Sequence, residues 1–218
     1  MSQQAIETYW QGRLTSLQAQ LEKNNFKAWI AKDQEEAKSI FWQEVFNQVR
    51  PKSVSLGGSM TVVNSGLFEE LKAAEGFELI YTYDTTPSKE EFIERRRQGL
   101  LADLFITSSN ALTMDGQLVN LDGVGNRVAG LTFGPVHCCL LIGRNKVVSG
   151  LDLALERVKE YAAPVNCLRL NKKTPCTKTM QCEDCSTPDR ICNTWVITEK
   201  SFPPERVKII LINQDLGY

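Results

Sequence analysis

The sequence predicts an α/β fold with an open, largely parallel sheet that helices cover on both faces. Short apolar runs of strand length alternate with segments whose apolar residues recur every three or four positions, which is typical of strands alternating with helices. The chain has 218 residues, of which 42% are hydrophobic and 23% charged, so it can bury a sizeable core. An N-terminal helix and a C-terminal cysteine-rich loop complete the expected architecture.

The composition argues against two classes of partner. With 25 basic and 26 acidic residues the formal net charge is -1, so no overall field attracts nucleic acid or an anionic membrane. Any anion site must therefore be local. The N-terminus lacks a basic region followed by an apolar block, and no apolar run approaches the length of a membrane span. We expect a soluble, cytoplasmic protein without a signal peptide.

Residues 1–50 are expected to form a segment that packs on the main domain, residues 51–218. Asp33 followed by Glu36 has the form of a helix N-cap and its reciprocal partner, after a short strand at residues 26–31. An apolar stripe at steps of three and four residues predicts a helix before this strand, packed on the body or on a partner. The stripe consists of Ile6, Trp10, Leu14, Leu17 and Leu21.

Residues 53–56 predict a strand that runs directly into the sequence GGSMT and a further helical pattern. A strand, a Gly-rich turn and a helix in this order direct backbone N–H groups and the positive end of the helix dipole at one point, which suits an anion. A plain turn followed by a helix cap is an equally good interpretation of so short a motif. The predicted anion loop comprises Gly57, Gly58, Ser59 and Thr61.

The next part of the chain contains two strands around a charged helix. Residues 77–83 and 104–107 have the apolar character of strands, and residues 87–101 have that of a helix. The helix carries acidic residues early and three arginines, residues 95–97, late, which complements its dipole. We expect these arginines to form a solvated turn, with a phosphate contact by one of them as the weaker alternative.

Residues 108–135 combine glycines with polar residues in a way that a buried core does not. Asp115-Gly116 and Asp122-Gly123 each stand between apolar, strand-like residues, which is a strong signal for two tight hairpins. Such turns present polar groups, and we predict that four of these groups line a ligand site at the base of the hairpins. The alternative is a pair of hairpins without a ligand. The four residues are Ser109, Asn110, Asn126 and Arg127.

The remainder of the chain is expected to supply three strands and one helix. The helix covers residues 151–162 and ends at Pro164. His137 is the only histidine, and its apolar neighbours favour a place on a strand face over a role as a catalytic base. The expected strands, of which the last two close the sheet, cover residues 137–142, 195–198 and 207–212.

Seven cysteines in a chain without a signal peptide indicate metal or redox chemistry more than disulfides. Three are scattered, whereas four lie in one loop, residues 174–193, from which their thiolates can converge on one metal centre. The irregular spacing favours a four-iron iron–sulfur cluster, with zinc as the alternative. Unrelated thiols and disulfides are the other interpretations. The predicted ligands are Cys176, Cys182, Cys185 and Cys192.

Several of these segments together resemble the LUD-domain family, named for lactate utilisation. The resemblance rests on LGGSMT, LADLFITSSNALTMDGQLVNLDGVGNRVAG, FGP, GRNK and the TPC…CxxC…ICN segment, in that order. It implies a Rossmann-like open sheet, as in ribose-5-phosphate isomerases, glucosamine-phosphate deaminases and coenzyme A transferases. The loop at residues 57–61 is similar to the phosphate-binding loop of the isomerases. Where those enzymes carry a Glu and Lys pair, however, this chain has Gly125-Asn126-Arg127, so isomerase activity is not expected.

The resemblance implies a subunit or accessory protein of lactate or hydroxy-acid utilisation that binds a small anionic metabolite. It would be one component of an L-lactate-oxidising oxidoreductase, with redox-protein subunits as partners. A homo-oligomer is a further expectation, which the resemblance does not imply. The link to redox chemistry adds weight to the iron–sulfur assignment. The alternative is a non-catalytic ligand-binding or assembly module whose cysteine loop holds a structural metal.

Overall fold

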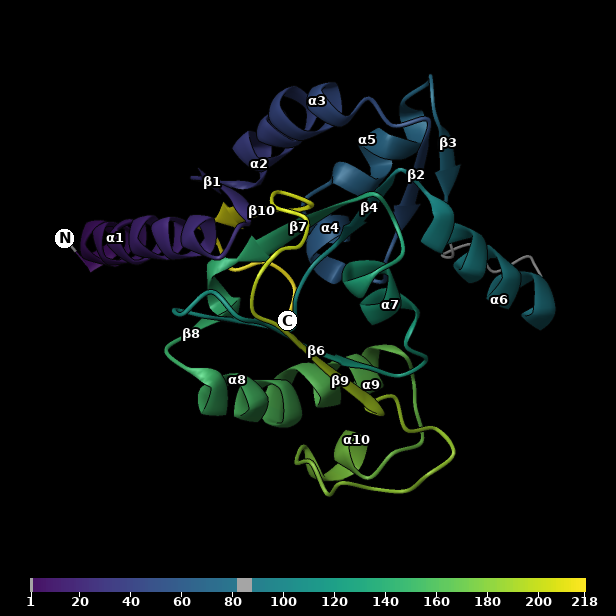
Figure 1. Ribbon diagram of the computed structural model, residues 1–218. Coiled ribbons are helices and arrows are strands. Elements are labelled where there is room, and N and C mark those ends of the chain that lie inside the picture. The colour runs from purple at the N-terminus through teal and green to yellow at the C-terminus, as the bar shows by residue number, and fades with distance from the viewer. Residues whose placement is uncertain (1, 82–87) are drawn as a thin grey trace.

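A sheet of six parallel strands forms the centre of the molecule (Figure 1). The computed structural model describes residues 2–81 and 88–218, and within these the strands follow the order β1-β10-β7-β4-β2-β3. Every neighbouring pair is parallel, so the carboxyl ends of the strands meet at one edge. The strands are β1 (Lys27–Ala31), β2 (Ser53–Leu56), β3 (Glu78–Ile80), β4 (Leu104–Thr107), β7 (His137–Gly143) and β10 (Val207–Ile212).

A second, mixed sheet of four short strands lies below the first in Figure 1, close to α8 (Leu151–Arg157) and α9 (Ala163–Arg169). Among the described residues its order is β8-β5-β6-β9, with β5 parallel to β8 and β6 antiparallel to both of its neighbours. The strands are β5 (Ala111–Thr113), β6 (Leu118–Asp122), β8 (Val147–Val148) and β9 (Thr194–Thr198).

Helices cover both faces of the six-stranded sheet, which confirms the predicted α/β class (Figure 1). The predicted N-terminal helix is present as α1 (Ser2–Lys23), and no helix in the described part of the chain is long and apolar enough to cross a bilayer. The other helices are α2 (Gln34–Ile40), α3 (Asn47–Val49), α4 (Met60–Asn64), α5 (Leu67–Ala73), α6 (Lys89–Gln98), α7 (Asn126–Thr132) and α10 (Cys176–Thr179).

Neighbouring residues of the central strands face two different cores. On β7, Cys139 and Leu141 join an apolar cluster with α2 and α5, whereas Leu140 and Ile142 join a cluster with α1 and the second sheet. Side chains alternate between the faces of a strand, so a strand buried on both faces is apolar throughout. Each fully buried leucine or isoleucine contributes roughly 1.5–3 kcal/mol of transfer free energy.

The predicted helix starts are present where the structure describes them. Asp33 Oδ1 accepts a hydrogen bond from Glu36 N (2.9 Å) at the start of α2, as the sequence predicts. Ser88 and Glu91 form a complete capping box at the start of α6. The strand predicted at residues 77–83 is the shorter β3. Positions 82–83 of this predicted strand, and Pro87 at the start of the predicted helix 87–101, lie outside the described residues.

The first of the two predicted hairpins exists, and the second prediction is wrong. β5 and β6 are joined by a tight turn at Gly116, whose φ of +81° suits glycine. After β6, in contrast, the chain enters α7 instead of another strand. Asp122 causes this change of direction, because its Oδ1 accepts hydrogen bonds from Val124 N (3.2 Å) and Gly125 N (2.9 Å) and so forms a local turn.

Two further expectations for the C-terminal part differ from the structure. The last two strands close different sheets, because β9 pairs with β6 and β10 lies between β1 and β7. The helix expected to end at Pro164 continues through α9. A π-helical stretch, Val158–Ala162, precedes the proline, which then occupies the first turn of α9, where its missing N–H costs little.

Candidate functional site

A pocket of about 310 Å³ lies at the carboxyl edge of the sheet, where the loops after β2 and β4 meet. The chain leaves β2 toward β3 on one side and later returns to β4 on the other, so the connecting loops diverge here. Ligands of open α/β sheets bind in the crevice at such a reversal. We name this cavity the basic pocket and define it by its charged wall residues, Arg96, Asp122, Arg127, Lys146 and Arg169.

The basic pocket brings together the two segments predicted from the sequence. Six of the eight predicted residues line it, whereas Gly57 and Thr61 do not. Gly57 is packed so closely that a Cβ there would lie 2.6 Å from Phe105 Cζ, and the buried Thr61 donates its hydroxyl to Leu216 O (3.2 Å). The six lining residues are Gly58, Ser59, Ser109, Asn110, Asn126 and Arg127.

Arg127 directs its guanidinium at protein acceptors on β6 and on the loop after β4. Its Nε lies 3.4 Å from the Asp122 carboxylate, and Nη2 donates to Asn110 Oδ1 (2.8 Å). Burial lowers the pKa of Arg127, and the negative charge of Asp122 opposes this shift. Because each guanidinium nitrogen has a partner, Arg127 supplies positive charge to the pocket but no unused donor. The remaining acceptors are Asn120 Oδ1, Ser108 O and Leu121 O.

Arg96 and Arg169 add positive charge at the rim. Arg96 comes from the arginine run of α6 and stacks 4.1 Å above the Phe92 ring; within the described ranges its buried Nε has no hydrogen-bond partner. Arg97, the next residue, is exposed and pairs with Glu94 at 3.6 Å, as expected for a solvated turn. Among the described residues, three arginines therefore face one acidic side chain, Asp122, in the walls of the basic pocket.

Lys146 is a site residue that the sequence analysis missed. It follows β7 on a short 3-10 turn, Arg144–Lys146, and only 4% of it is exposed. Its Nζ donates to Ser108 Oγ and Ser109 O, both at 3.2 Å. Burial lowers the pKa of this lysine well below its ordinary value, and the charges of Arg157 and Arg127 lower it further. Lys146 belongs to the polar run GRNK, whose composition is typical of a surface turn. No sequence pattern therefore indicated that this lysine is buried.

His137 lies away from this pocket, at the first residue of β7 and thus at the opposite edge of the sheet. Its Nδ1 is 3.3 Å from Lys208 Nζ. Burial lowers the pKa of the imidazole, with smaller contributions from the positive charges of Lys208 and Arg206. These contacts agree with the expectation of a histidine on a strand face.

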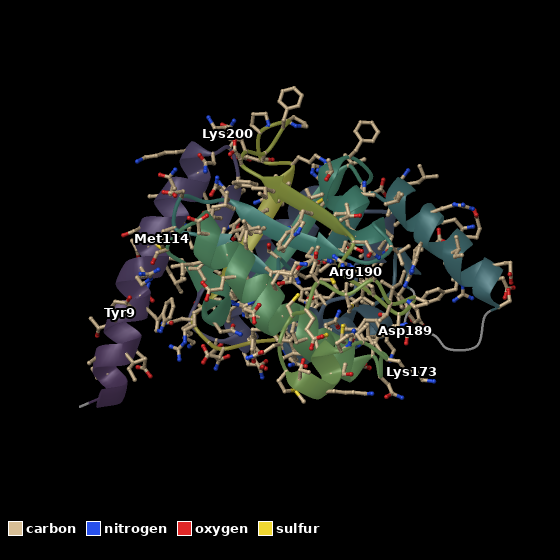
Figure 2. All side chains as sticks on the ribbon, turned by 90° about the horizontal axis from the view of Figure 1, so that it is seen from below. Tyr9, Met114, Lys173, Asp189, Arg190 and Lys200 are labelled. Atoms are coloured by element: carbon tan, nitrogen blue, oxygen red, sulfur yellow. The ribbon has the colours of Figure 1, made fainter. Side chains whose placement is uncertain are left out.

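The four predicted metal ligands and a fifth cysteine, Cys167, line one small cavity of about 20 Å³. We name it the thiol cavity; Cys167, which stands apart from the other four in the sequence, was predicted to be one of the scattered cysteines. Asp189 accepts from Lys173 N (2.8 Å) and so draws the ends of this segment together, as the labels in Figure 2 show. In the described part of the chain, no group of three His, Cys, Asp or Glu side chains is arranged to hold a metal ion.

The basic pocket and the thiol cavity share a wall. Ile191 lines both, and α9 presents Asn166 and Arg169 to the pocket but Cys167 to the cavity. The backbones also meet closely here, because a Cβ on Gly123 would lie only 3.1 Å from Ile191 O. The cysteine segment therefore forms part of the support of the pocket.

Comparisons with known proteins agree with this architecture. The chain is similar in structure to a DUF162 family protein from Deinococcus radiodurans, at 13% sequence identity and a TM-score of 0.51, covering 94% of this chain and 98% of that chain. No curated protein sequence matches the chain significantly. The sequence model of the LUD domain matches residues 14–212, which is most of the chain and includes the thiol cavity and every wall residue of the basic pocket except Tyr218. The chain therefore belongs to the LUD-domain family.

Proposed function

We propose that this LUD-domain protein acts in the utilisation of lactate or a related hydroxy acid by binding a small organic anion in the basic pocket. The observation that carries the proposal is the excess of positive side chains: among the described wall residues, Arg96, Arg127 and Arg169 face one acidic side chain, Asp122. A buried charge without a partner is costly, and a bound carboxylate or phosphate would offset that cost. Arg96 supports the proposal most directly, since its buried Nε has no acceptor within the described residues.

Ligand binding is tested by thermal unfolding with L-lactate, phosphate and the neutral analogue lactamide. A true ligand stabilises the folded state by RT ln(1 + [L]/Kd), about 2.7 kcal/mol at a hundred times Kd. Arg96→Gln should weaken anion binding by roughly 1.5–3 kcal/mol, the range for a hydrogen bond to a charged group. The matched control is Arg97→Gln, an exposed neighbour outside the pocket wall. Equal losses in both variants, or an equal response to lactamide, would reject the site.

Participation in oxidation is a separate step of the proposal. We infer that the protein works as a subunit, so L-lactate with an artificial electron acceptor should be oxidised only when redox partner proteins are added. Anion binding without lactate oxidation, both for the protein alone and with the redox partner proteins added, would favour the alternative, a non-catalytic binding module. The family membership of residues 14–212 supports a role in lactate utilisation in either case.

We also propose that the thiol cavity holds a metal centre, which rests on five thiols lining one cavity. Thiolates select zinc and iron–sulfur clusters. A cavity of about 20 Å³ has room for roughly one water-sized atom, which supports a single zinc ion, whereas the four-iron cluster favoured by the spacing requires the segment to widen. Zinc would stabilise the segment, and a cluster would supply one-electron transfer.

Metal analysis and visible spectra of protein purified without oxygen distinguish these cases. Colourless protein with one zinc supports the single ion, and brown protein supports the cluster; Cys185→Ser should lose either metal. Cys167→Ser shows whether the fifth thiol is a ligand. Metal-free protein with paired disulfides would reject the proposal.

A further inference from the structure

The nitrogen of Lys146 stands in the wall of the basic pocket, next to the loop after β4. The residue follows the carboxyl end of β7, which is the neighbour of β4 in the sheet. Although it is almost fully buried, its side chain lines the pocket. A ligand in the pocket would therefore be within reach of a buried amine.

The hydrogen bonds of Lys146 fit an unprotonated amine. Within the described residues Nζ has two acceptors, Ser108 Oγ and Ser109 O, each at 3.2 Å. An ammonium group has three N–H donors, so it would leave one unmatched, whereas a neutral amine has two. With both donors used, the lone pair remains for a ligand.

The surrounding charges act in the same direction. Arg157 and Arg127 are the charged groups that affect Lys146 most, and both are positive. The nearest carboxylate of the pocket wall, Asp122, is paired with Arg127. Arg157 is itself fixed by donating to Asn110 O (2.6 Å) and Asn145 O (3.0 Å), so it cannot turn away. Neighbours of this kind favour the neutral form of a buried amine, which is the state required of a nucleophilic lysine.

We propose that Lys146 attacks the carbonyl carbon of a small 2-oxo carboxylate whose carboxylate is held by Arg96 and Arg169 of the basic pocket. The inference rests on the anion binding proposed above. The nitrogen lone pair forms a bond to the carbonyl carbon, and a proton passes from nitrogen to the carbonyl oxygen, giving a carbinolamine. The hydroxyl then leaves with the second nitrogen proton as water, and an imine remains. The step consumes no oxidant or reductant.

Reductive trapping tests this inference. The protein is incubated with pyruvate and sodium borohydride, which converts an imine into a stable secondary amine, and the modified peptide is identified by mass spectrometry. We expect one adduct, on Lys146, which disappears in Lys146→Met. Lys208→Met is the matched control, because Lys208 is also buried but lies outside the pocket wall. Neutral glyceraldehyde should give at least about tenfold less adduct, since it lacks the carboxylate that a charged hydrogen bond holds.

The outcomes separate this inference from the proposed function. Pyruvate that raises the melting temperature without forming an adduct overturns the nucleophile and leaves anion binding intact. An adduct spread over surface lysines, or found equally with glyceraldehyde, also overturns it. Arg96→Gln should reduce trapping at low pyruvate by roughly tenfold or more, while Arg97→Gln leaves it unchanged. Peptide mapping of the wild-type protein after trapping identifies the modified lysine directly. The test therefore remains valid even if Lys146→Met does not fold.

Discussion

At the scale of single residues, Arg127 was predicted to line a ligand site, where its guanidinium can either contact a carboxylate or phosphate of the ligand or act as a structural clamp within the protein. Its contacts favour the clamp, since its guanidinium nitrogens meet acceptors from Ser108 to Asp122. These acceptors belong to β6 and to the loop between β4 and β5. The side chain thus joins the predicted site residues to one another, and the ligand contacts fall to other arginines.

Arg127→Lys should lower the free energy of unfolding by roughly 1–3 kcal/mol, because an ammonium cannot reach all of these buried acceptors. Urea unfolding measures the change, and Arg97→Lys, an exposed arginine, is the control. Anion affinity should change less than in Arg96→Gln. Unchanged stability together with a large loss of anion affinity would instead support a direct ligand contact.

A second residue-scale prediction concerns Glu70, which joins α5 to the helix before β2. Trp42 Nε1 donates to one of its carboxylate oxygens (2.7 Å) and Lys38 Nζ lies 2.9 Å from the other. Burial raises the pKa of Glu70, but these two contacts outweigh it and the net shift is below the ordinary 4.5. A lowered pKa stabilises the folded protein above the unfolded pKa, and this stabilisation is lost as the pH falls through the folded value.

Glu70→Gln should therefore cost stability near neutral pH and little in acid. We expect about 0.5–1 kcal/mol at most, because the carboxylate is partly exposed to solvent. Urea unfolding of both proteins from about pH 7 to about pH 3 measures the difference. A difference that stays constant over this range would show that packing, and not charge, is responsible.

At the scale of elements, α1 is packed unevenly along its length. Leu14, Leu17 and Leu21 are fully buried against the sheet, whereas Ile6 is 45% exposed. The start of the helix projects from the body, and Figure 2 shows Tyr9 on this part. Leu17→Ala should lower the free energy of unfolding by roughly 2–5 kcal/mol, the range for buried leucines. Ile6→Ala, measured by the same urea titration, should stay within about 0.5 kcal/mol, unless a partner covers the exposed half.

The contact between Gly123 and the cysteine segment predicts coupling between two elements. A Cβ at this position meets Ile191 O at 3.1 Å and Ile191 Cα at 3.2 Å, so the segment must shift. Gly123→Ala should lower the free energy of unfolding by roughly 1–3 kcal/mol and speed the reaction of the loop thiols with a thiol reagent. Gly150→Ala is the control, since no atom lies within 4 Å of its Cβ position. Equal labelling rates in the two variants would disprove the coupling.

At the scale of the whole molecule, the sequence predicted the central sheet better than the second one. β7 and β10 are buried on both faces and are therefore continuous apolar runs. β5 and β8 have three and two residues, too few for a periodic pattern. The pairing of β9 with β6 depends on contacts between segments far apart in the chain, which local patterns do not record.

The same distinction applies to the basic pocket. Glycine and asparagine turns marked the segments at residues 57–61 and 108–127, because their residue types are unusual for a core. Arg96 and Lys146 belong to ordinary charged runs, and only tertiary burial distinguishes them from surface residues. Asn166 and Arg169 were missed because Pro164 was interpreted as a helix stop, although a π-helical stretch accommodates it.

The strand order has a consequence for synthesis on the ribosome. β10 lies between β1 and β7, pairing Lys27 with Lys208 and Val207 with Cys138. Until β10 emerges, β1 has no neighbour in the sheet and β7 has an open, apolar edge, and such edges recruit other chains. Contacts this distant in sequence also form slowly. Until β10 is synthesised, β1 and the edge of β7 therefore stay unpaired, so the nascent chain should depend on chaperones. Translation that stalls before β10 should yield aggregates rather than a smaller folded unit.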